Sequence, residues 1–227
     1  RYENYSQTAC GLVLDFDEVI DTKEMGNSTE GGWPSTSARQ YINSDIYNAL
    51  PSDLKSIIIP TKVVSGYTGS DTTNYVSLDK LYFLSLIEIY DYEMAQVDTV
   101  SADCTRQLDY YRLLETTTRN TTPVIKTNGT NPSDYWLRIP YSYNSNSYYV
   151  VATTDGELNI NDSSSLSGIS PVFRIGMSNT NYYTINYWYD KGVKATFLSN
   201  EITKKEMQEI IDNTDSKIFI QLFGYIP

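Results

Sequence analysis

The sequence predicts an α+β protein with one large domain followed by a small C-terminal unit. Helix-like and strand-like segments mix irregularly over the first half of the chain, three short strands follow, and a separate pattern begins after Gly176. Mixtures that do not alternate regularly are typical of α+β folds. The 227 residues are enough for a large domain with a small companion. We therefore expect a domain at 1–176 and a unit at 177–227.

The N-terminal part predicts a strand, a loop and a helix. Residues 11–20 carry apolar side chains in partial alternation, which indicates a buried strand or a pair of short strands. Residues 21–32 are expected to form a loop. Apolar residues then recur at helical spacing, so we expect a helix over about 36–49, capped by Ser35 or Ser37.

The next part predicts a second short helix and two strands. Pro51 ends the first helix and opens another, which stops before Pro60. A short strand at 62–65 and a polar loop at 66–77 follow. Residues 80–85 form the most strand-like run of the chain and are expected in the core.

A capping box and a long loop mark the middle of the chain. Ser85 followed by Glu88 is the pattern of a capping box, so a short helix should start directly after the strand. Another helix is expected at 103–115, with apolar residues on one side. The segment 116–134 is rich in Thr and Asn and is expected to be a loop.

Three short strands are predicted next, at 135–139, 148–153 and 172–175. The dipeptide Asp155-Gly156 between the second and third of them is a strong signal for a hairpin turn.

The C-terminal unit is expected to fold as ββαβ. Its strands are predicted at 183–189, 193–198 and 217–223. Between the last two, Thr203 and Glu206 form a capping box, with Ile202 and Met207 as a hydrophobic staple. The helix should bury one face, made of Met207, Ile210 and Ile211.

Composition excludes several classes of function. The net charge is -11, which repels nucleic acid and anionic lipid, and no apolar run is long enough to insert into a membrane. The absence of His removes catalytic triads and His-bearing metal centres. The only two cysteines, Cys10 and Cys104, could pair or could be unrelated buried thiols. We expect no cofactor.

Several motifs occur in a characteristic order. GGWPS precedes the first helix, DKLYFLS and RQLDYY follow, and YWLRIPYS at 135–142 and GISPVFRIG at 168–176 close the series. This order resembles an uncharacterised family of bacterial surface-protein domains, common in gut Firmicutes, with a Trp-Leu-Arg strand and a Gly-Val-x-Pro-x-Phe-Arg ending. The resemblance covers about residues 10–176 and implies a location outside the cell, on the cell surface or on a virion.

In layout this family is similar to the C-type-lectin-like fold, including its branch shared with formylglycine-generating enzymes. The resemblance implies that the strands 136–139 and 172–175 lie in one sheet. The formylglycine branch would need reactive cysteines near the C-terminal part of its domain, and Cys10 and Cys104 are far from it in sequence. The resemblance therefore implies the fold rather than that activity.

The same layout is used by variable proteins of diversity-generating retroelements, which favour Tyr, Asn, Ser, Thr and Asp at exposed positions. Most residues from 141 to 167 are of these types, and Lys and Arg are absent there. Tyr gives contact area at low entropic cost, and small polar residues adapt their hydrogen bonds. The predicted ligand-binding residues are Tyr141, Tyr143, Asn144, Asn146, Tyr148, Tyr149, Asn159, Asn161, Asp162 and Ser163.

Three other sets of residues have a functional and a structural interpretation. Trp136, Arg138 and Arg174 could bind a ligand, but strand residues of this kind more often pack and bond within the core. A second set, Glu88 and Asp91, could form a glycosidase pair, although the capping box already explains the glutamate. The third set could bind Ca²⁺, but its spacing matches no defined loop: Asp155, Asn159, Asn161 and Asp162.

The sequence therefore predicts a non-enzymatic module that binds a protein or a glycan on another cell or surface. Two alternatives remain: a carbohydrate-active or sulfatase-activating type of enzyme, and a structural spacer within an adhesin. The stretch 141–165 could also be a solvated loop system without a ligand.

Overall fold

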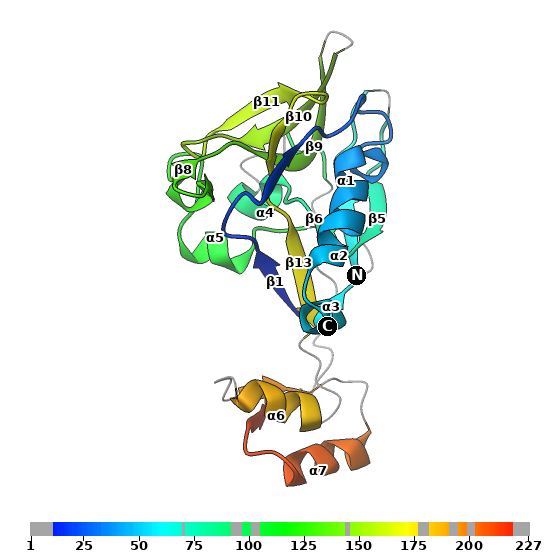
Figure 1. The fold of residues 1–227 in the computed structure, drawn as a ribbon, viewed down its shortest axis with the longest axis vertical. Helices are drawn as coiled ribbons and strands as arrows, with labels where there is room; N and C mark the ends of the chain where they lie inside the picture. Colours follow the sequence, from blue (N-terminus) through cyan, green and yellow to red (C-terminus); the bar gives the residue numbers. More distant parts are fainter. Residues whose placement is uncertain are drawn as a thin grey trace. The chain divides into compact units, whose positions relative to one another are not determined.

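The computed structural model describes residues 11–69, 71–91, 97–100, 105–143, 146–176, 182–190, 195–198 and 203–219. The chain divides into two compact units: among the described residues, 13–174 belong to unit 1, and 11–12 belong to unit 2 together with those from 175 onward. Unit 1 holds most of the strands and the short helices, and unit 2 holds two helices and a strand pair (Figure 1). The fold is α+β, as the sequence predicts.

A five-stranded sheet carries the polar segment of unit 1, in the strand order β11-β10-β9-β12-β2. Its strands, in chain order, are β2 (Asp21–Lys23), β9 (Tyr135–Tyr143), β10 (Asn146–Ala152), β11 (Leu158–Asp162) and β12 (Ser167–Ile169). The strands β10 and β11 form the hairpin that Asp155-Gly156 predicts, because Gly156 supplies the positive φ of its turn. The predicted loop at 21–32 is wrong at its start, where β2 pairs with β12.

A second sheet forms around β13 (Val172–Gly176), which pairs with three other strands and whose last two residues belong to unit 2. These are β1 (Gly11–Asp15), β3 (Ile58–Ile59) and β6 (Leu81–Tyr82). The prediction that the strands 136–139 and 172–175 share a sheet is therefore wrong. β9 and most of β13 belong to unit 1, but the two strands pair with different strands.

Two strand pairs and several short helices complete unit 1. The pairs are β4 (Thr61–Ser65) with β5 (Tyr75–Asp79), and β7 (Thr127–Asn128) with β8 (Asn131–Pro132). The helical segments are η1 (Trp33–Ser35), α1 (Ser37–Tyr41), η2 (Ile42–Ile46), α2 (Tyr47–Ala49), α3 (Ser52–Ile57), α4 (Leu86–Tyr90), α5 (Asp109–Leu113) and η4 (Thr122–Val124). The helix predicted over 103–115 is shorter than expected, and Leu114 is exposed. Both cysteines lie outside the described residues.

The helix predicted over 36–49 is confirmed, although it contains a π-helical turn, η2, between α1 and α2. Its cap is Thr36 rather than a serine, and the Thr36 hydroxyl accepts a hydrogen bond from the Arg39 N–H at 3.1 Å. The capping residue lies directly after η1, whose entry uses Gly32 at a positive φ. A Cβ at Gly32 would lie 2.3 Å from the Tyr75 ring, so only glycine fits there.

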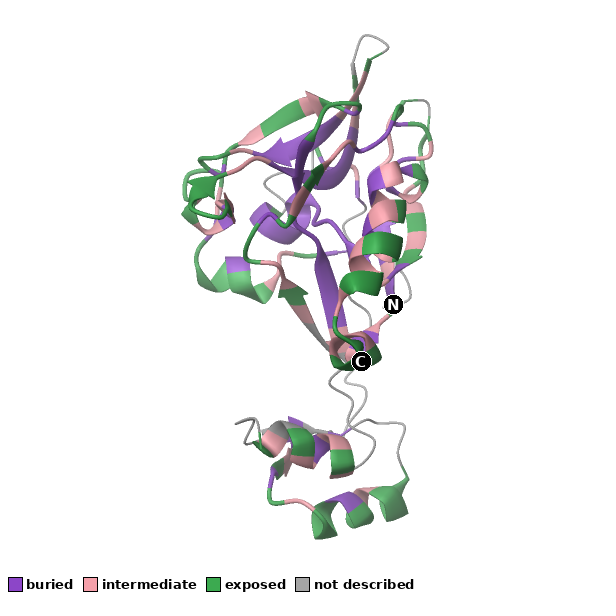
Figure 2. Ribbon diagram, viewed as in Figure 1, coloured by how far each residue is buried: buried purple, intermediate pink, exposed green. Residues whose placement is uncertain are grey.

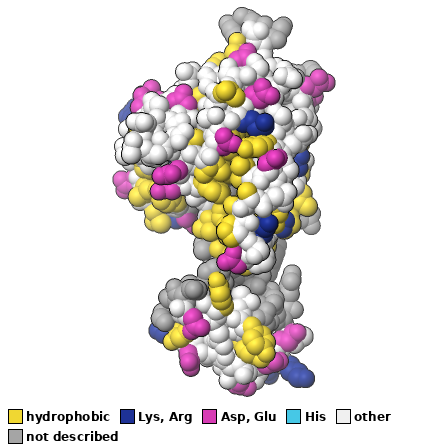
Figure 3. Space-filling model, in the orientation of Figure 1, with side chains coloured by type: hydrophobic (Ala, Val, Ile, Leu, Met, Phe, Trp, Pro, Cys, Tyr) yellow, Lys and Arg dark blue, Asp and Glu magenta, His cyan; other side chains and the backbone are white. Residues whose placement is uncertain are grey.

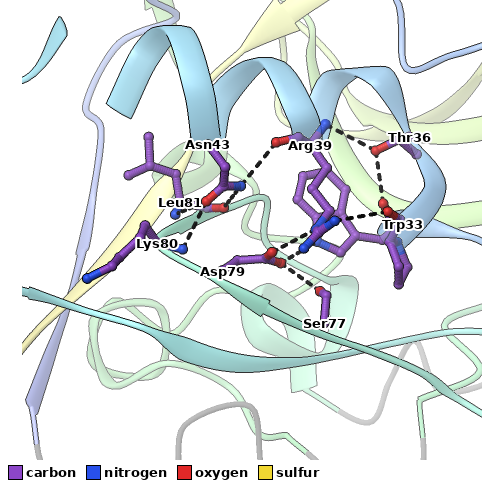
Figure 4. A network of polar contacts seen from close by, with 9 residues as sticks. Trp33, Thr36, Arg39, Asn43, Ser77, Asp79, Lys80 and Leu81 are labelled. Carbon is purple, nitrogen blue, oxygen red and sulfur yellow. Dashed lines mark hydrogen bonds and ion pairs between the residues drawn. The ribbon is translucent and has the colours of Figure 1, made fainter. Parts of the chain in front are cut away.

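A buried carboxylate, Asp79, fastens this helix to β5 (Figure 4). It accepts hydrogen bonds from the Trp33 indole N–H at 2.9 Å, the Arg39 guanidinium at 2.7 Å and the Ser77 hydroxyl at 2.6 Å. One turn further along the helix, Asn43 bonds the backbone around β6 in both directions. Trp33 of the GGWPS motif is therefore a core residue whose indole N–H has a hydrogen-bond acceptor inside the core.

Unit 2 consists of α6 (Tyr182–Asp190), β14 (Ala195–Phe197), α7 (Lys204–Asp212) and β15 (Lys217–Phe219). The two strands pair in parallel, so α7 forms the crossover between them. The predicted ββαβ order is wrong, because the segment 183–189 is helical. Its Ile185 packs in a small core with Leu198 and Ile210, and Tyr182, three residues earlier in the helix, packs against the same core.

The α7 helix itself matches the sequence pattern in part. Thr203 and Glu206 form the predicted capping box, in which each side chain accepts from the other residue's backbone N–H. Ile210 is buried and Met207 packs against the core. Ile211 is 43% exposed, so its predicted burial is wrong. The staple residue Ile202 lies outside the described residues.

Candidate functional site

The candidate site is a face of the five-stranded sheet formed by β9, β10 and β11. The register places Tyr148 of β10 directly opposite Tyr141 of β9 and Asp162 of β11. Residues directly opposite one another in antiparallel strands point to the same face, with Cβ atoms about 4.5 to 5.5 Å apart. The two tyrosines and the aspartate therefore form one row across three strands.

Alternation along the strands adds two neighbours to this row. Asn146 lies two residues before Tyr148, and Ile160 lies two residues before Asp162, so both point to the same face. Asn146 and Asp162 are exposed, the two tyrosines are half-buried, and Ile160 is 38% exposed. In Figure 2, β11 is exposed or half-buried along its length, whereas the second half of β10 is buried. We call these five residues the open face. Ile160 was not among the predicted site residues, and only the register assigns it.

The carboxylate of Asp162 has a fixed position. Its Oδ1 accepts hydrogen bonds from the Ser164 hydroxyl at 2.6 Å and from the Ser164 backbone N–H at 2.9 Å. These two hydrogen bonds lower the pKa of the carboxyl below its ordinary value of 3.8. Asp162 is therefore ionised at neutral pH, and the turn after β11 orients it.

The opposite side of the sheet, which we call the covered face, comprises Trp136, Ser142, Ser147 and Tyr149. Trp136 and Tyr149 are fully buried, Ser147 is half-buried, and Ser142 at the outer end is exposed. The Thr29 hydroxyl contacts the hydroxyls of Ser142 and Ser147, and Trp136 donates its indole N–H to the carbonyl of Lys23 at 2.7 Å. Both contacts come from the segment that runs from β2 to η1.

For two of the predicted binding residues, Tyr149 and Ser163, the prediction of an exposed position is wrong. Tyr149 is fully buried, because it alternates with Tyr148 and points to the covered face. Burial raises the pKa of its hydroxyl. Ser163 is also buried, and its carbonyl accepts from the Gly26 N–H at 3.0 Å. Neither side chain is therefore available at the surface for ligand binding.

The remaining predicted residues are placed as follows. Asn161 is half-buried opposite Tyr149, and Asn159 is exposed opposite Val151, so both alternate with the open face instead of belonging to it. Of Tyr143, the structure describes the backbone, which pairs with Asn146 at the end of β9. Asn144 lies outside the described residues.

Arg138 shows that the structural interpretation of the Trp-Leu-Arg strand holds. The register between β9 and β10 shifts between Tyr149 and Val151, and at this irregularity the Arg138 N–H donates to the Leu84 carbonyl at 3.0 Å. Its guanidinium donates to Val64 and Phe83 carbonyls and to Glu88 Oε2 at 2.5 Å. The ion pair with Glu88 is fully buried.

The charges in this buried pair support one another. Burial alone would lower the pKa of Arg138, but the charge and the hydrogen bond of Glu88 reverse that effect and raise it. Glu88 also accepts from the Ser85 backbone N–H at 2.9 Å and from the Thr105 hydroxyl at 3.1 Å. The hydrogen bond from the Ser85 backbone N–H to the Glu88 side chain is one of the two bonds of the predicted capping box. The ion-pair partner was not predicted, although an Arg inside an apolar strand requires a buried acceptor.

The other two interpretations find no geometric support. Glu88 is buried and engaged by Arg138, whereas Asp91 is exposed, so the two carboxylates do not face a common site. Among the residues that the structure describes, no group of three His, Cys, Asp or Glu could hold a metal ion. Asp155 bonds the Thr153 hydroxyl within the hairpin turn, and Asp162 bonds Ser164.

Comparison with known proteins gives one result. The family model described as a domain of unknown function, DUF6273, matches residues 12–177. The chain belongs to this family. The match spans β13 and the whole five-stranded sheet, so the open face lies within the DUF6273 domain. Neither the curated proteins nor the solved structures yield a match. Within the described part of the chain, every helix is too short or too polar to cross a membrane.

Proposed function

We propose that this DUF6273 domain is a non-enzymatic binding module that recognises a protein or a glycan through its open face. The observation that carries the proposal is the row formed by Tyr141, Tyr148 and Asp162 on three neighbouring strands. Half-buried tyrosine rings offer contact area at low entropic cost, and the oriented carboxylate offers a directional acceptor.

The rigid frame behind the row supports the same role. Sites on strands are held more precisely than sites on loops, because packing fixes their rotamers. Beneath the open face, Tyr149 and Trp136 are buried and Arg138 is fixed by Glu88. A surface of this kind can vary in its exposed residues without loss of the fold.

The proposal also includes a C-type-lectin-like fold, a location on a cell or virion surface, and diversification of the open face by a retroelement. The bias toward Tyr, Asn and Ser in 141–167 supports the last part. Its test is the nucleotide sequence around the gene. Diversification requires a reverse transcriptase gene and a near-copy of the segment that encodes 136–176, differing mainly at adenines.

Binding is tested with a set of matched variants on a glycan array and in pull-downs from surface proteomes. The test variant carries Tyr141→Ala, Asn146→Ala and Tyr148→Ala. The control carries Tyr110→Ala and Tyr187→Ala, two tyrosines that are exposed elsewhere. We expect the test variant to lose the partner of the wild-type chain and the control to keep it. A partner that survives the triple substitution but is lost from the control would place the binding site elsewhere.

A further inference from the structure

The ligand chemistry of the open face follows from its charge, and this inference rests on the function proposed above. Between Arg138 and Arg174 the sequence contains no Lys or Arg, but it contains Asp155, Glu157 and Asp162. In β10, β11 and the outer part of β9 the only charged residue is therefore Asp162, and Asp155 and Glu157 lie in the turn between β10 and β11. Acidic side chains, with a few Lys and Arg side chains among them, are scattered over the part of unit 1 seen in Figure 3. The chain as a whole has a net charge of -11.

We infer that the open face binds an arginine-bearing, basic segment of a partner protein. The positions of the three central residues suit a guanidinium group. Tyr148 lies between Tyr141 and Asp162 in one row. A guanidinium stacks on a tyrosine ring within about 6 Å of its centre. From that position it reaches a carboxylate on the neighbouring strand, which it can bind through two N–H groups.

The carboxylate of Asp162 is prepared for such a partner. Both hydrogen bonds from Ser164 go to Oδ1, and among the described residues no group bonds Oδ2. Because the turn already orients the carboxylate, the side chain loses little conformational entropy when it binds a cation. Lysine would gain the charge interaction but lacks the planar group that stacks and bonds at once.

Two other ligand classes fit less well. Acidic glycans and nucleic acids find no Lys or Arg in these strands, and the net charge of -11 repels them. A neutral glycan could stack on the tyrosines, but it would gain nothing from an ionised aspartate that has no cationic neighbour in its own strands. Neutral glycan binding is therefore an alternative outcome of the test.

The test uses the full chain and four probes in an NMR titration of backbone amides. The probes are a capped tri-arginine peptide, its tri-citrulline analogue, which is neutral and of the same shape, a capped tri-lysine peptide, and a neutral disaccharide. We expect tri-arginine to shift the signals of Tyr141, Tyr148 and Asp162, to bind more tightly than tri-lysine, and tri-citrulline to have little effect.

Two variants with the same change in net charge separate a site from general attraction. Asp162→Asn should weaken tri-arginine binding about fivefold to tenfold, as the loss of a charge-assisted hydrogen bond does. Glu209→Gln, an exposed residue of α7, should leave it within about twofold. Equal effects of both variants would overturn the inference, because binding would then follow net charge alone.

Failure of this inference is distinguishable from failure of the proposed function. If the disaccharide shifts the open-face signals and tri-arginine does not, the inference of a basic ligand is wrong, but the proposal that the open face binds a ligand is supported. If tri-arginine shifts only signals elsewhere, the inference is wrong, and the triple variant on the array decides independently whether the face binds anything.

Discussion

Tyr148 and Tyr149 are neighbours in β10, yet they belong to opposite sides of the same sheet. Tyr148 forms the centre of the open face, whereas Tyr149 is fully buried on the covered face. Both tyrosines come from the same segment, which is rich in Tyr, Asn and Ser. Composition therefore marks the segment, but strand alternation and the segment that covers one side decide what each residue does.

The serines show the same difference. On the covered face, the hydroxyls of Ser142 and Ser147 contact the Thr29 hydroxyl, and they fix the segment that leads to η1. At the edge of the open face, the Ser164 hydroxyl bonds Asp162 and orients a charge. We expect substitutions on the covered side to act on stability, and substitutions on the open side to act on binding.

The largest effect should come from the buried ion pair behind the sheet. Replacing Arg138→Met leaves the Glu88 carboxylate buried without its cation, which should lower the free energy of unfolding by about 3 to 5 kcal/mol. Urea denaturation followed by tryptophan fluorescence measures the change.

The double variant Arg138→Met with Glu88→Met is the control for this prediction. Removing both charges abolishes the uncompensated carboxylate, so much of the lost stability should return. If the double variant is as unstable as Arg138→Met alone, the cost comes from lost packing and from the three carbonyl bonds of the guanidinium, and not from the charge of Glu88.

Single substitutions of Tyr148 and Tyr149 give the most direct test of the difference between the open face and the covered face. Tyr149→Ala should create a core cavity and cost about 3 to 5 kcal/mol. Tyr148→Ala should cost about 0.5 kcal/mol or slightly more, because the ring is only partly buried. Thermal denaturation of the two single variants measures the difference. Similar losses from both would show that the open face is packed as tightly as the covered one.

A single-atom change sharpens the same test. Within the described residues, the buried hydroxyl of Tyr149 has no hydrogen-bond partner. An unsatisfied buried hydroxyl destabilises the fold by about 1 kcal/mol or more. Tyr149→Phe should therefore keep or raise the melting temperature, in contrast to Tyr149→Ala. A clear loss of stability would indicate that the hydroxyl is bonded in solution.

A smaller effect is expected from pH, through a second buried carboxylate near Arg138. Burial raises the pKa of Asp98 above its ordinary value of 3.8. The folded protein then holds this proton more tightly than the unfolded chain. The free energy of unfolding should therefore fall as pH rises from the ordinary pKa to the raised pKa, by at most about 1.4 kcal/mol per pH unit.

The measurement is urea denaturation at a series of pH values, with Asp98→Asn as the test and the exposed Asp53→Asn as the control. Asp98→Asn should flatten the decline and Asp53→Asn should leave it unchanged. An equal slope in all three proteins would assign the decline to another group, of which Asp15 is one, since burial raises its pKa as well.

The fold was predictable where local signals determine it. The caps at Glu88 and Thr203 and the turn at Asp155-Gly156 depend on neighbouring residues, and the structure has all three. The segment 183–189 was mistaken for a strand because its aromatic and β-branched residues favour strands. Packing of Ile185 against Leu198 and Ile210 overrides that preference, and such contacts are not visible in a local pattern.

The candidate site was predictable as a region but not residue by residue. A shift of one residue in strand register exchanges the two faces, and the sequence does not fix the register of β10. For this reason the prediction included Tyr149 and Ser163, which are buried, and omitted Ile160, which is exposed. Partners far apart in sequence, such as Gly26 and Ser163, decide which face is covered.

The smallest change in stability, and the most specific one, is expected at Ser164. Its hydroxyl is the main cause of the lowered pKa of Asp162, and its backbone N–H contributes next. Ser164→Ala removes the first hydrogen bond and keeps the second, so the pKa of Asp162 should rise partway toward its ordinary value, as measured by NMR titration of the carboxyl carbon. The free energy of unfolding should change by less than about 0.5 kcal/mol, because the hydroxyl is exposed. Ser165→Ala, a change at the exposed neighbour, should leave the pKa of Asp162 unaltered.

On the covered face, Ser147→Ala should instead lower the free energy of unfolding by about 0.5 to 1.5 kcal/mol without changing the charge of Asp162. If Ser164→Ala destabilises the chain as much as Ser147→Ala does, the hydroxyls on the two sides have the same structural role and the division into two faces fails.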